Sequence, residues 1–481
     1  AETRNVHFDG PLDGTLRRNA PPPPQKPNEL ADHKFRHKFE ASDAQEMQQL
    51  LHKDAIILMG PDDPATRARI AAGDRASGLK YPLIMKIRVV RAYKLRPDGC
   101  TILKAKSRFT GPGYRQREGV HFDQTYAPVS DMTCLRTMLS VAVRNKYQLF
   151  QADVAGAYLN SDLGAVMYVI IFGSIYLVNK ALYGFKQAAR LWNKDMDSEL
   201  KRLGFVVSKA DPCLYVKRDD AGVIFICTWV DDMMGAASSK QLHLDFKQNF
   251  KYALSASGKF EYVLKIKATI GDDGTLSLNQ AEYIVDMAKE FGLTNANPKL
   301  TPMITGASFC MDEAPAPGSD EQAVMDLLPY RRLLGMLMYV MNMRPDIAFA
   351  VIKLSKFGAN PSMAQYKALK RILVYLYTTR QRSLVMGRFK GDYTTVGGVV
   401  CNDRNPLSVT VDADHGGCKD TAKSTSGGSI KCYGDLVWAM SRRQKKVTSS
   451  TAAAELEAMG AVLRRVTNLR EAMRDLGCYQ E

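Results

Sequence analysis

The chain has 481 residues, which is long enough for two or three domains with buried cores. Its net charge of +16 and pI near 9.3 favour a polyanionic partner, most commonly nucleic acid, although a basic surface can also serve solubility alone. Nine cysteines without a Cys-x-x-Cys pair indicate free thiols and a reducing compartment. No apolar run reaches the roughly 18 residues needed to span a bilayer, so we expect no membrane partner.

Residues 1–40 are polar and include four consecutive prolines at 21–24, which predicts a flexible lead-in. Residues 41–58 predict a helix followed by a short strand. The first folded domain is therefore expected to begin near residue 41.

Basic and apolar residues alternate at 83–94, a Pro-Asp-Gly turn follows at 97–99, and basic residues return at 104–108. This pattern predicts a cationic two-stranded ribbon. Lys104 and Lys106 on such a ribbon could neutralise phosphates, or they could simply keep an exposed edge soluble.

Apolar periodicity predicts a helix over 131–146 and a strand over 148–153, the strand ending at Asp153. An acid at the end of a strand can bind a metal or a substrate, but it can equally cap the next helix. A long helix is predicted over 181–203, where Gly204 ends it.

The stretch 225–234 carries two adjacent acids, Asp231 and Asp232, inside an apolar and β-branched run, which predicts a β-hairpin with the acids at its tip. Unpaired carboxylates within an apolar run are costly to bury. A divalent cation would relieve that cost, while a solvated Asp-Asp turn is the simpler alternative.

Residues 298–328 are rich in proline and glycine and predict a linker. Apolar helices are expected after it, at 330–343, 346–357 and 362–377. The last block alternates short strands with a terminal helix over 451–476. We therefore divide the chain into units at 41–297, 298–328, 329–383 and 384–481.

Asp153, Asp231 and Asp232 lie at strand ends, as a two-metal site requires. Magnesium prefers hard oxygen ligands and retains several waters, so a few aspartates suffice. We expect two Mg²⁺ ions, for which Mn²⁺ could substitute.

Several stretches jointly resemble the reverse transcriptases of Ty1/copia-type retrotransposons, in the order the family has them. They are 125–129 (TYAPV), 151–154 (QADV), 157–160 (AYLN), 181–188 (ALYGFKQA), 230–232 (VDD), 329–331 (PYR), 344–348 (RPDIA) and 368–373 (ALKRIL). The resemblance implies an α+β right-hand polymerase with fingers, palm and thumb. A helical connector and a partial ribonuclease H-like α/β domain would follow.

In that family the three aspartates would be the catalytic, metal-binding triad of the palm. Tyr158 resembles the aromatic gate that rejects a ribose 2′-hydroxyl, although a core aromatic would look the same. Gln187 resembles a glutamine near the incoming nucleotide, or is a polar residue in the first turn of a helix. Trp229 stands where the family usually has tyrosine and could abut the primer terminus. Lys104 and Lys106 would contact the nucleotide, with Lys106 in place of the usual arginine.

The stretches 411–414 (VDAD), 423–428 (KSTSGG) and 449–455 (SSTAAAE) resemble the attached ribonuclease H domain. They would make Asp412 and Glu455 its first two metal-binding acids, although Asp412 alone reads as a strand-end acid. The family's later acids lie beyond Glu481, so we expect a truncated domain with little RNA-strand cleavage.

The resemblance implies an RNA-directed DNA polymerase that uses an RNA template, a DNA or tRNA primer and deoxynucleoside triphosphates. It would act beside other Gag and Pol products in a cytoplasmic virus-like particle, with a nuclear location as the alternative. The rival hypotheses are a catalytically inactive nucleic-acid-binding remnant and a cellular DNA-templated polymerase.

Overall fold

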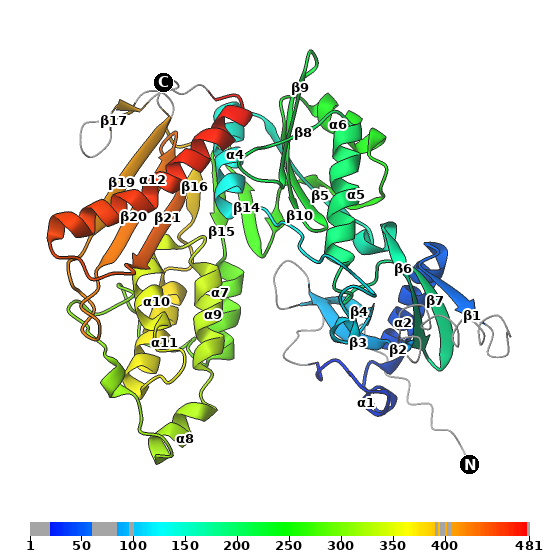
Figure 1. Ribbon diagram of the computed structural model, residues 1–481, viewed down its shortest axis with the longest axis horizontal. Coiled ribbons are helices and arrows are strands. Elements are labelled where there is room, and N and C mark those ends of the chain that lie inside the picture. Colours follow the sequence, from blue (N-terminus) through cyan, green and yellow to red (C-terminus); the bar gives the residue numbers. More distant parts are fainter. Residues whose placement is uncertain are drawn as a thin grey trace.

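The computed structural model describes residues 20–59, 84–95, 101–389, 393–394, 400–401 and 406–478. It is a mixed α/β structure in which the N-terminal elements, a central sheet, a helical unit and a C-terminal sheet follow one another (Figure 1). The predicted turn at 97–99 and residues 1–19 of the predicted lead-in lie outside the described residues.

The N-terminal unit combines helices with a cationic ribbon and a small sheet. Its helices are α1 (Pro27–Ala31) and α2 (Arg36–His52), and the ribbon pairs β3 (Arg88–Leu95) with β4 (Ile102–Thr110). The sheet has the order β1-β7-β6-β2, from β1 (Ile56–Met59), β7 (Ser174–Lys180), β6 (Asp162–Ile171) and β2 (Ile84–Lys86). The predicted cationic ribbon is thereby confirmed.

The prediction of a flexible lead-in over 1–40 is wrong for its described part. Phe35 and Phe39 are buried with Ile102 of β4, and α2 packs along that strand. Arg91 forms a buried ion pair with Asp43, at 2.6 Å between Nη2 and Oδ2. Burial of two aromatic rings stabilises this segment by several kcal/mol, which outweighs the polar character of the residues around them.

The central sheet positions the predicted acids. Its order is β12-β5-β11-β10-β9-β8, from β12 (Leu254–Lys259), β5 (Gln148–Val154), β11 (Asp232–Ala237), β10 (Gly222–Trp229), β9 (Leu214–Asp219) and β8 (Val206–Val207). Alternate residues enter different cores because successive strand side chains point to opposite faces. Leu149 packs with α4 (Met132–Arg144), whereas Phe150 packs with α5 (Ala188–Arg202) and α6 (Lys240–Asn249).

The helix predicted over 181–203 begins later than expected. Residues 181–187 form turns, and α5 starts at Ala188. The turn is bound to the N-terminal unit, since the Gly111 amide donates to the Tyr183 carbonyl at 2.7 Å. Tertiary hydrogen bonding therefore replaces helix formation in this stretch.

The three helices expected after the linker are confirmed as α9 (Tyr330–Val340), α10 (Ala348–Ser355) and α11 (Met363–Thr378). They share one core with α7 (Ala281–Glu290), which precedes the predicted linker, and with α8 (Asp320–Leu327), a helix that forms within it. A small antiparallel sheet joins them to the central unit, in the order β13 (Tyr262–Val263), β14 (Ile266–Ile270), β15 (Leu276–Asn279) and β16 (Leu384–Met386).

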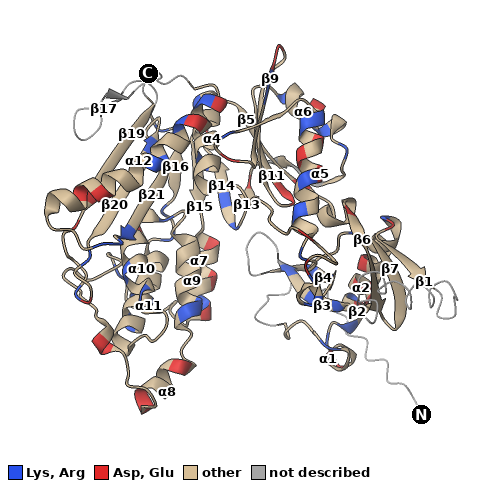
Figure 2. Ribbon diagram, viewed as in Figure 1, with Lys and Arg blue, Asp and Glu red and all other residues tan. Residues whose placement is uncertain are grey.

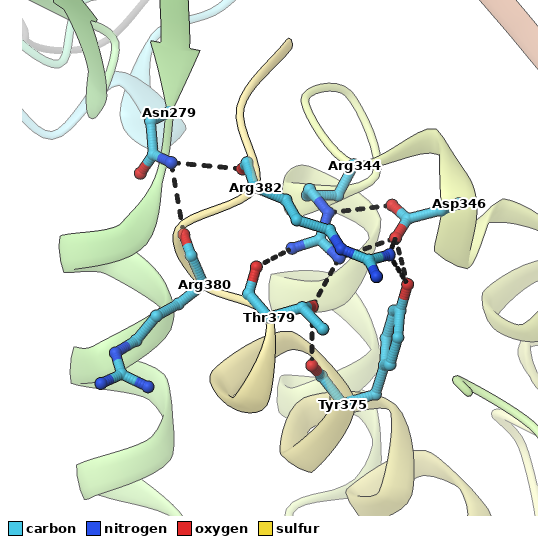
Figure 3. Close-up of polar contacts among 7 residues, drawn as sticks. All are labelled: Asn279, Arg344, Asp346, Tyr375, Thr379, Arg380 and Arg382. Atoms are coloured by element: carbon cyan, nitrogen blue, oxygen red, sulfur yellow. Dashed lines mark hydrogen bonds and ion pairs between the residues drawn. The ribbon is translucent and has the colours of Figure 1, made fainter. Parts of the chain in front are cut away.

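A polar cluster ties the start of α10 to the end of α11 (Figure 3). The guanidinium of Arg344 donates to both carboxylate oxygens of Asp346, at 2.9 and 2.7 Å, and to the carbonyl of Thr379 at 3.0 Å. The hydroxyl of Tyr375 donates to the same carboxylate. The 344–348 motif is therefore a structural junction of the helical unit.

The C-terminal sheet has the order β19 (Leu407–Ala413), β20 (Thr425–Cys432) and β21 (Asp435–Arg443), and α12 (Thr451–Asp475) lies across it (Figure 1). A short pair, β17 (Tyr393–Thr394) and β18 (Val400–Cys401), precedes it. This block does not have a core of its own, because Ile430 and Val462 pack in one cluster with Leu135 of α4. It is docked on the face of the central sheet opposite α5 and α6.

Candidate active site

The hairpin predicted around the paired acids is confirmed. Strands β10 and β11 pair with Trp229 opposite Asp232, which leaves Val230 and Asp231 as a two-residue loop. Val230 has a φ of 60°, in the left-handed region that β-branched residues rarely adopt. The hairpin thus presents both carboxylates at a tight and strained tip.

The sheet brings Asp153 to the same place. Strand β5 pairs antiparallel with β11 so that Asp153 lies directly opposite Asp232. The Val154 amide also donates to the Asp231 carbonyl at 3.0 Å. Directly opposed residues of an antiparallel pair have Cβ atoms about 4.5–5.5 Å apart, on the same face. Two segments almost eighty residues apart therefore deliver their acids to one edge of the sheet.

The carboxylates at this edge repel one another. Burial raises the pKa of Asp232 to about 6, and the negative charges of Asp231 and Asp153 add to the shift. Burial also raises the pKa of Asp231, with Asp153 adding to the shift, while Arg108 and Lys106 oppose it. A bound cation would relieve this repulsion.

Two of the acids, Asp153 and Asp231, face the cationic ribbon across a cleft of about 830 Å³, whereas Asp232 is not among the residues that line it. Charged residues from both sides line it: Glu46, Lys94, Lys104, Lys106, Arg108, Asp153 and Asp231. Burial, together with the charges of Arg108 and Lys94, lowers the pKa of Lys106. Figure 2 shows the Lys and Arg positions on β3 and β4. The cleft therefore combines acids suited to metal ions with cations suited to phosphates.

Lys94, Arg108 and Tyr183 line the cleft but were not among the site residues predicted from the sequence. Arg108 and Lys94 follow the same alternation as Lys104 and Lys106, so the strand period could have identified them. Arg108 lies over the ring of Tyr183, with 4.9 Å between the guanidinium carbon and the ring centroid. Tyr183 had no local signal, because its place depends on the turn before α5.

Tyr158 lies beside this cleft, in a 3₁₀ turn over Ala157–Asn160. Its ring meets that of Tyr183 edge-on, with centroids 5.1 Å apart. Burial raises the pKa of its hydroxyl, and the negative charge of Asp231 adds to the shift. The phenol of Tyr158 therefore interacts electrostatically with the carboxylate at the hairpin tip. Trp229 is half-buried at the end of β10.

Gln187 is not among the residues that line the cleft. It is buried, its Oε1 accepts from Gln116 at 2.9 Å, and its Nε2 donates to the carbonyl of His121 at 2.9 Å. Both ends of the amide are thus bonded within the protein, as expected of a residue that holds the turn before α5 in place.

Asp412 on β19 and Glu455 on α12 belong to the C-terminal block, whose sheet is separate from the one that carries the hairpin. Asp412 is exposed on β19, and a carboxylate oxygen of Glu455 accepts from the amide of the next residue, Ala413, at 3.2 Å. These two acids therefore form a separate pair from the three at the hairpin.

In the part of the chain that the structure describes, no three His, Cys, Asp or Glu side chains converge closely enough to hold a metal ion by themselves. Magnesium is usually bound by one or two carboxylates, substrate phosphates and waters rather than by an all-protein cage. The oxygen donors of Asp153, Asp231 and Asp232 fit such a partial ligand set.

The family model for reverse transcriptase (RNA-dependent DNA polymerase) matches residues 84–305. The chain is 32% identical over 405 residues to a retrovirus-related Pol polyprotein from transposon TNT 1-94 of Nicotiana tabacum, which covers 81% of this chain and 29% of that protein. It is 29% identical to the polyprotein from transposon RE1 of Arabidopsis thaliana (82% and 26%). It is 28% identical to a putative transposon Ty5-1 protein of Saccharomyces cerevisiae (57% and 87%).

The chain spans less than a third of the length of the two plant relatives. Among solved structures, it is similar to a foamy viral protease-reverse transcriptase in complex with dsDNA, with a TM-score of 0.47 and 14% identity over 95% of this chain and 75% of that one. None of the helices in the described ranges has the length and apolar character to cross a membrane. The family model and the transposon relatives thus identify a reverse transcriptase domain in this chain, similar to that of the Pol polyproteins of copia-type retrotransposons.

Proposed function

We propose that this chain is an RNA-directed DNA polymerase whose active site is the edge of the central sheet that carries Asp153, Asp231 and Asp232. One observation carries the proposal: Asp153 is in register with Asp232, while the neighbouring amide of Val154 binds the Asp231 carbonyl. The backbone thereby fixes the three acids relative to one another.

The three aspartates would hold two Mg²⁺ ions, which supply an activated primer 3′-hydroxyl and neutralise charge on the leaving pyrophosphate. The ribbon cations Lys104 and Lys106 would bind the triphosphate from the opposite wall of the cleft. Tyr158 would limit the space at the ribose, and Trp229 would abut the primer terminus. Gln187 would act indirectly, by holding the turn before α5 through its buried hydrogen bonds.

The same proposal assigns the parts of a right-hand polymerase. Residues 41–297 would form the fingers and palm with the start of the thumb, and the packing of Phe35 and Phe39 extends this unit back to the start of α2. The helices at 329–383 would be the thumb and connector, and a ribonuclease H-like block would follow. Since β16 pairs with β15, we place the start of that block after Met386.

We expect weak RNA-strand cleavage by the C-terminal block. Asp412 and Glu455 lie close together, but the family motifs assign only these two acids to the C-terminal block, and two carboxylates alone hold a pair of metal ions poorly. Release of labelled fragments from an RNA–DNA hybrid at a rate similar to primer extension would contradict this expectation.

The partners that follow are an RNA template, a DNA or tRNA primer and deoxynucleoside triphosphates. Other Gag and Pol products of the element, in a cytoplasmic particle, would surround the polymerase. The strong net charge of +16 supports binding of nucleic acid, with an affinity that falls as salt rises.

Extension of a DNA primer on an RNA template tests the proposal. We expect Mg²⁺-dependent extension by the wild type and its loss in Asp231→Asn. The control is Asp162→Asn, because the Asp162 side chain is 85% exposed and lies outside the cleft. Salt-sensitive template binding without incorporation at any Mg²⁺ or Mn²⁺ concentration would favour an inactive remnant. Better extension on a DNA template would favour a DNA-templated enzyme.

A further inference from the structure

The loop between β10 and β11 is held in a conformation that its sequence disfavours. Among the described residues, Val230 is the sole β-branched residue with a positive φ, at 60°. Two-residue hairpin loops with positive φ normally use Asn, Asp or Gly, because a branched side chain clashes with the backbone there. A strained loop of this kind persists only when contacts with the surrounding structure hold it in that conformation.

Two hydrogen bonds from different elements restrain the loop. The indole Nε1 of Trp192, on α5, donates to the carbonyl of Val230 at 2.7 Å. The amide of Val154, on β5, donates to the next carbonyl, that of Asp231, at 3.0 Å. Both loop carbonyls are thus fixed, one from the helix under the sheet and one from the neighbouring strand.

Trp192 is itself immobilised by packing. Its side chain is 1% exposed, and its ring meets that of Tyr252 edge-on at 5.0 Å between centroids. It belongs to the core cluster between the central sheet and α5, which also contains Met196 one helical turn further on. The direction of the indole N–H is therefore set by the core and cannot adjust to a displaced loop.

We infer that Trp192 is a positioning residue that holds the strained Val230 and thereby aims the carboxylates of Asp231 and Asp232, an inference that rests on the proposed function. Trp192 touches neither substrate nor metal. Because its ring is fixed in the core, its hydrogen bond to the Val230 carbonyl keeps the loop in place. Without that bond, Val230 would relax towards negative φ and turn the adjacent Asp231 away from Asp153.

The test is a double-mutant cycle, which compares Trp192→Phe, Val230→Gly and the variant that carries both substitutions. Phenylalanine retains a buried ring but lacks the N–H. Glycine adopts positive φ without strain, so a loop that contains it depends less on the bond. Trp438→Phe is the matched control, because Trp438 lies on β21 of the C-terminal sheet, which does not pair with the sheet that carries the hairpin.

We expect Trp192→Phe to lower kcat and to weaken Mg²⁺ half-saturation, each by roughly tenfold, as loss of a residue that orients metal ligands typically does. KM for the template–primer should not change. In the Val230→Gly background the same substitution should have less than about a third of that effect. Equal effects in both backgrounds, or equal effects of Trp438→Phe, would show a merely structural role and overturn the inference.

Amide hydrogen exchange of peptides covering 229–233 supplies a readout that does not depend on activity. Trp192→Phe should speed exchange there, and Trp438→Phe should not. Unchanged exchange in Trp192→Phe would overturn the positioning role. If the wild type extends no primer but the exchange pattern holds, the proposed function fails while the restraint of the loop by Trp192 stands.

Discussion

The docking of the C-terminal block on α4 should depend on pH through Asp435. This residue is 2% exposed, at the start of β21. Its carboxylate accepts from the hydroxyl of Ser140 at 2.7 Å and from the amide of Gly387 at 2.9 Å. Burial nevertheless raises the pKa of Asp435 to about 6, because these bonds compensate only part of the lost hydration.

A folded-state pKa above the unfolded one means that folding favours the protonated form. The stability of the wild type should therefore be reduced as the pH rises from about 4 to about 6, and then level off. The shift from 3.8 to about 6 corresponds to up to ~3 kcal/mol in the free energy of unfolding above pH 6. Other groups titrate in the same range, so the effect must be measured as a difference between variants.

Asp435→Asn provides that difference. The asparagine carbonyl can accept from the Gly387 amide, and its NH₂ can donate to Ser140, whose hydroxyl already lies 3.0 Å from the Cys432 carbonyl. We expect the variant to gain about 2–3 kcal/mol relative to wild type between pH 4 and pH 7. Urea unfolding of both proteins at several pH values measures this gain.

The exposed Asp162→Asn is the control and should show no pH-dependent difference from wild type. A stability difference between Asp435→Asn and wild type that is constant from pH 4 to pH 7 would refute the reasoning. So would a difference that shrinks as the pH rises, because it would mean that the ionised carboxylate is stabilised by folding.

Three further predictions follow from individual contacts. Arg91→Ala leaves Asp43 buried without its ion pair and should reduce the free energy of unfolding by about 3–5 kcal/mol in urea titrations. Arg344→Lys cannot reproduce the two parallel bonds to Asp346 (Figure 3) and should cost about 1–3 kcal/mol in the same assay. Burial opposes ionisation of Cys418, but hydrogen bonds from a nearby threonine and the charge of a lysine outweigh it and lower its pKa to about 7. It should therefore react with iodoacetamide at neutral pH before the fully buried cysteines do, as peptide mass spectrometry would show.

The acids at the hairpin could be predicted because their signals are local. Two carboxylates inside an apolar run indicate a hairpin tip, and an acid at the end of a strand marks Asp153. The ribbon that carries Lys104 and Lys106 could also be predicted, because basic and apolar residues alternate along it. No local pattern specifies which strands pair, so the position of β5 beside β11 could be expected only from the family resemblance.

Other features had no local signal. The burial of Phe35 depends on a strand more than sixty residues away, and the polar segment around it suggested a flexible lead-in instead. The bond between Ser140 and Asp435 joins residues 295 positions apart. The place of Gln187 near the nucleotide was predicted from the family resemblance alone, whereas its buried partners, Gln116 and His121, are known only from the fold.

The central claim is that two distant segments build one catalytic centre, and Asp153→Asn tests it most directly. The measurement is single-nucleotide primer extension on an RNA template at saturating Mg²⁺, with template–primer affinity measured in parallel. We predict a loss of extension of more than about 100-fold with affinity within about threefold of wild type, since loss of a direct ligand should exceed the effect of losing an outer residue. Extension by Asp153→Asn at a rate close to wild type would contradict the account.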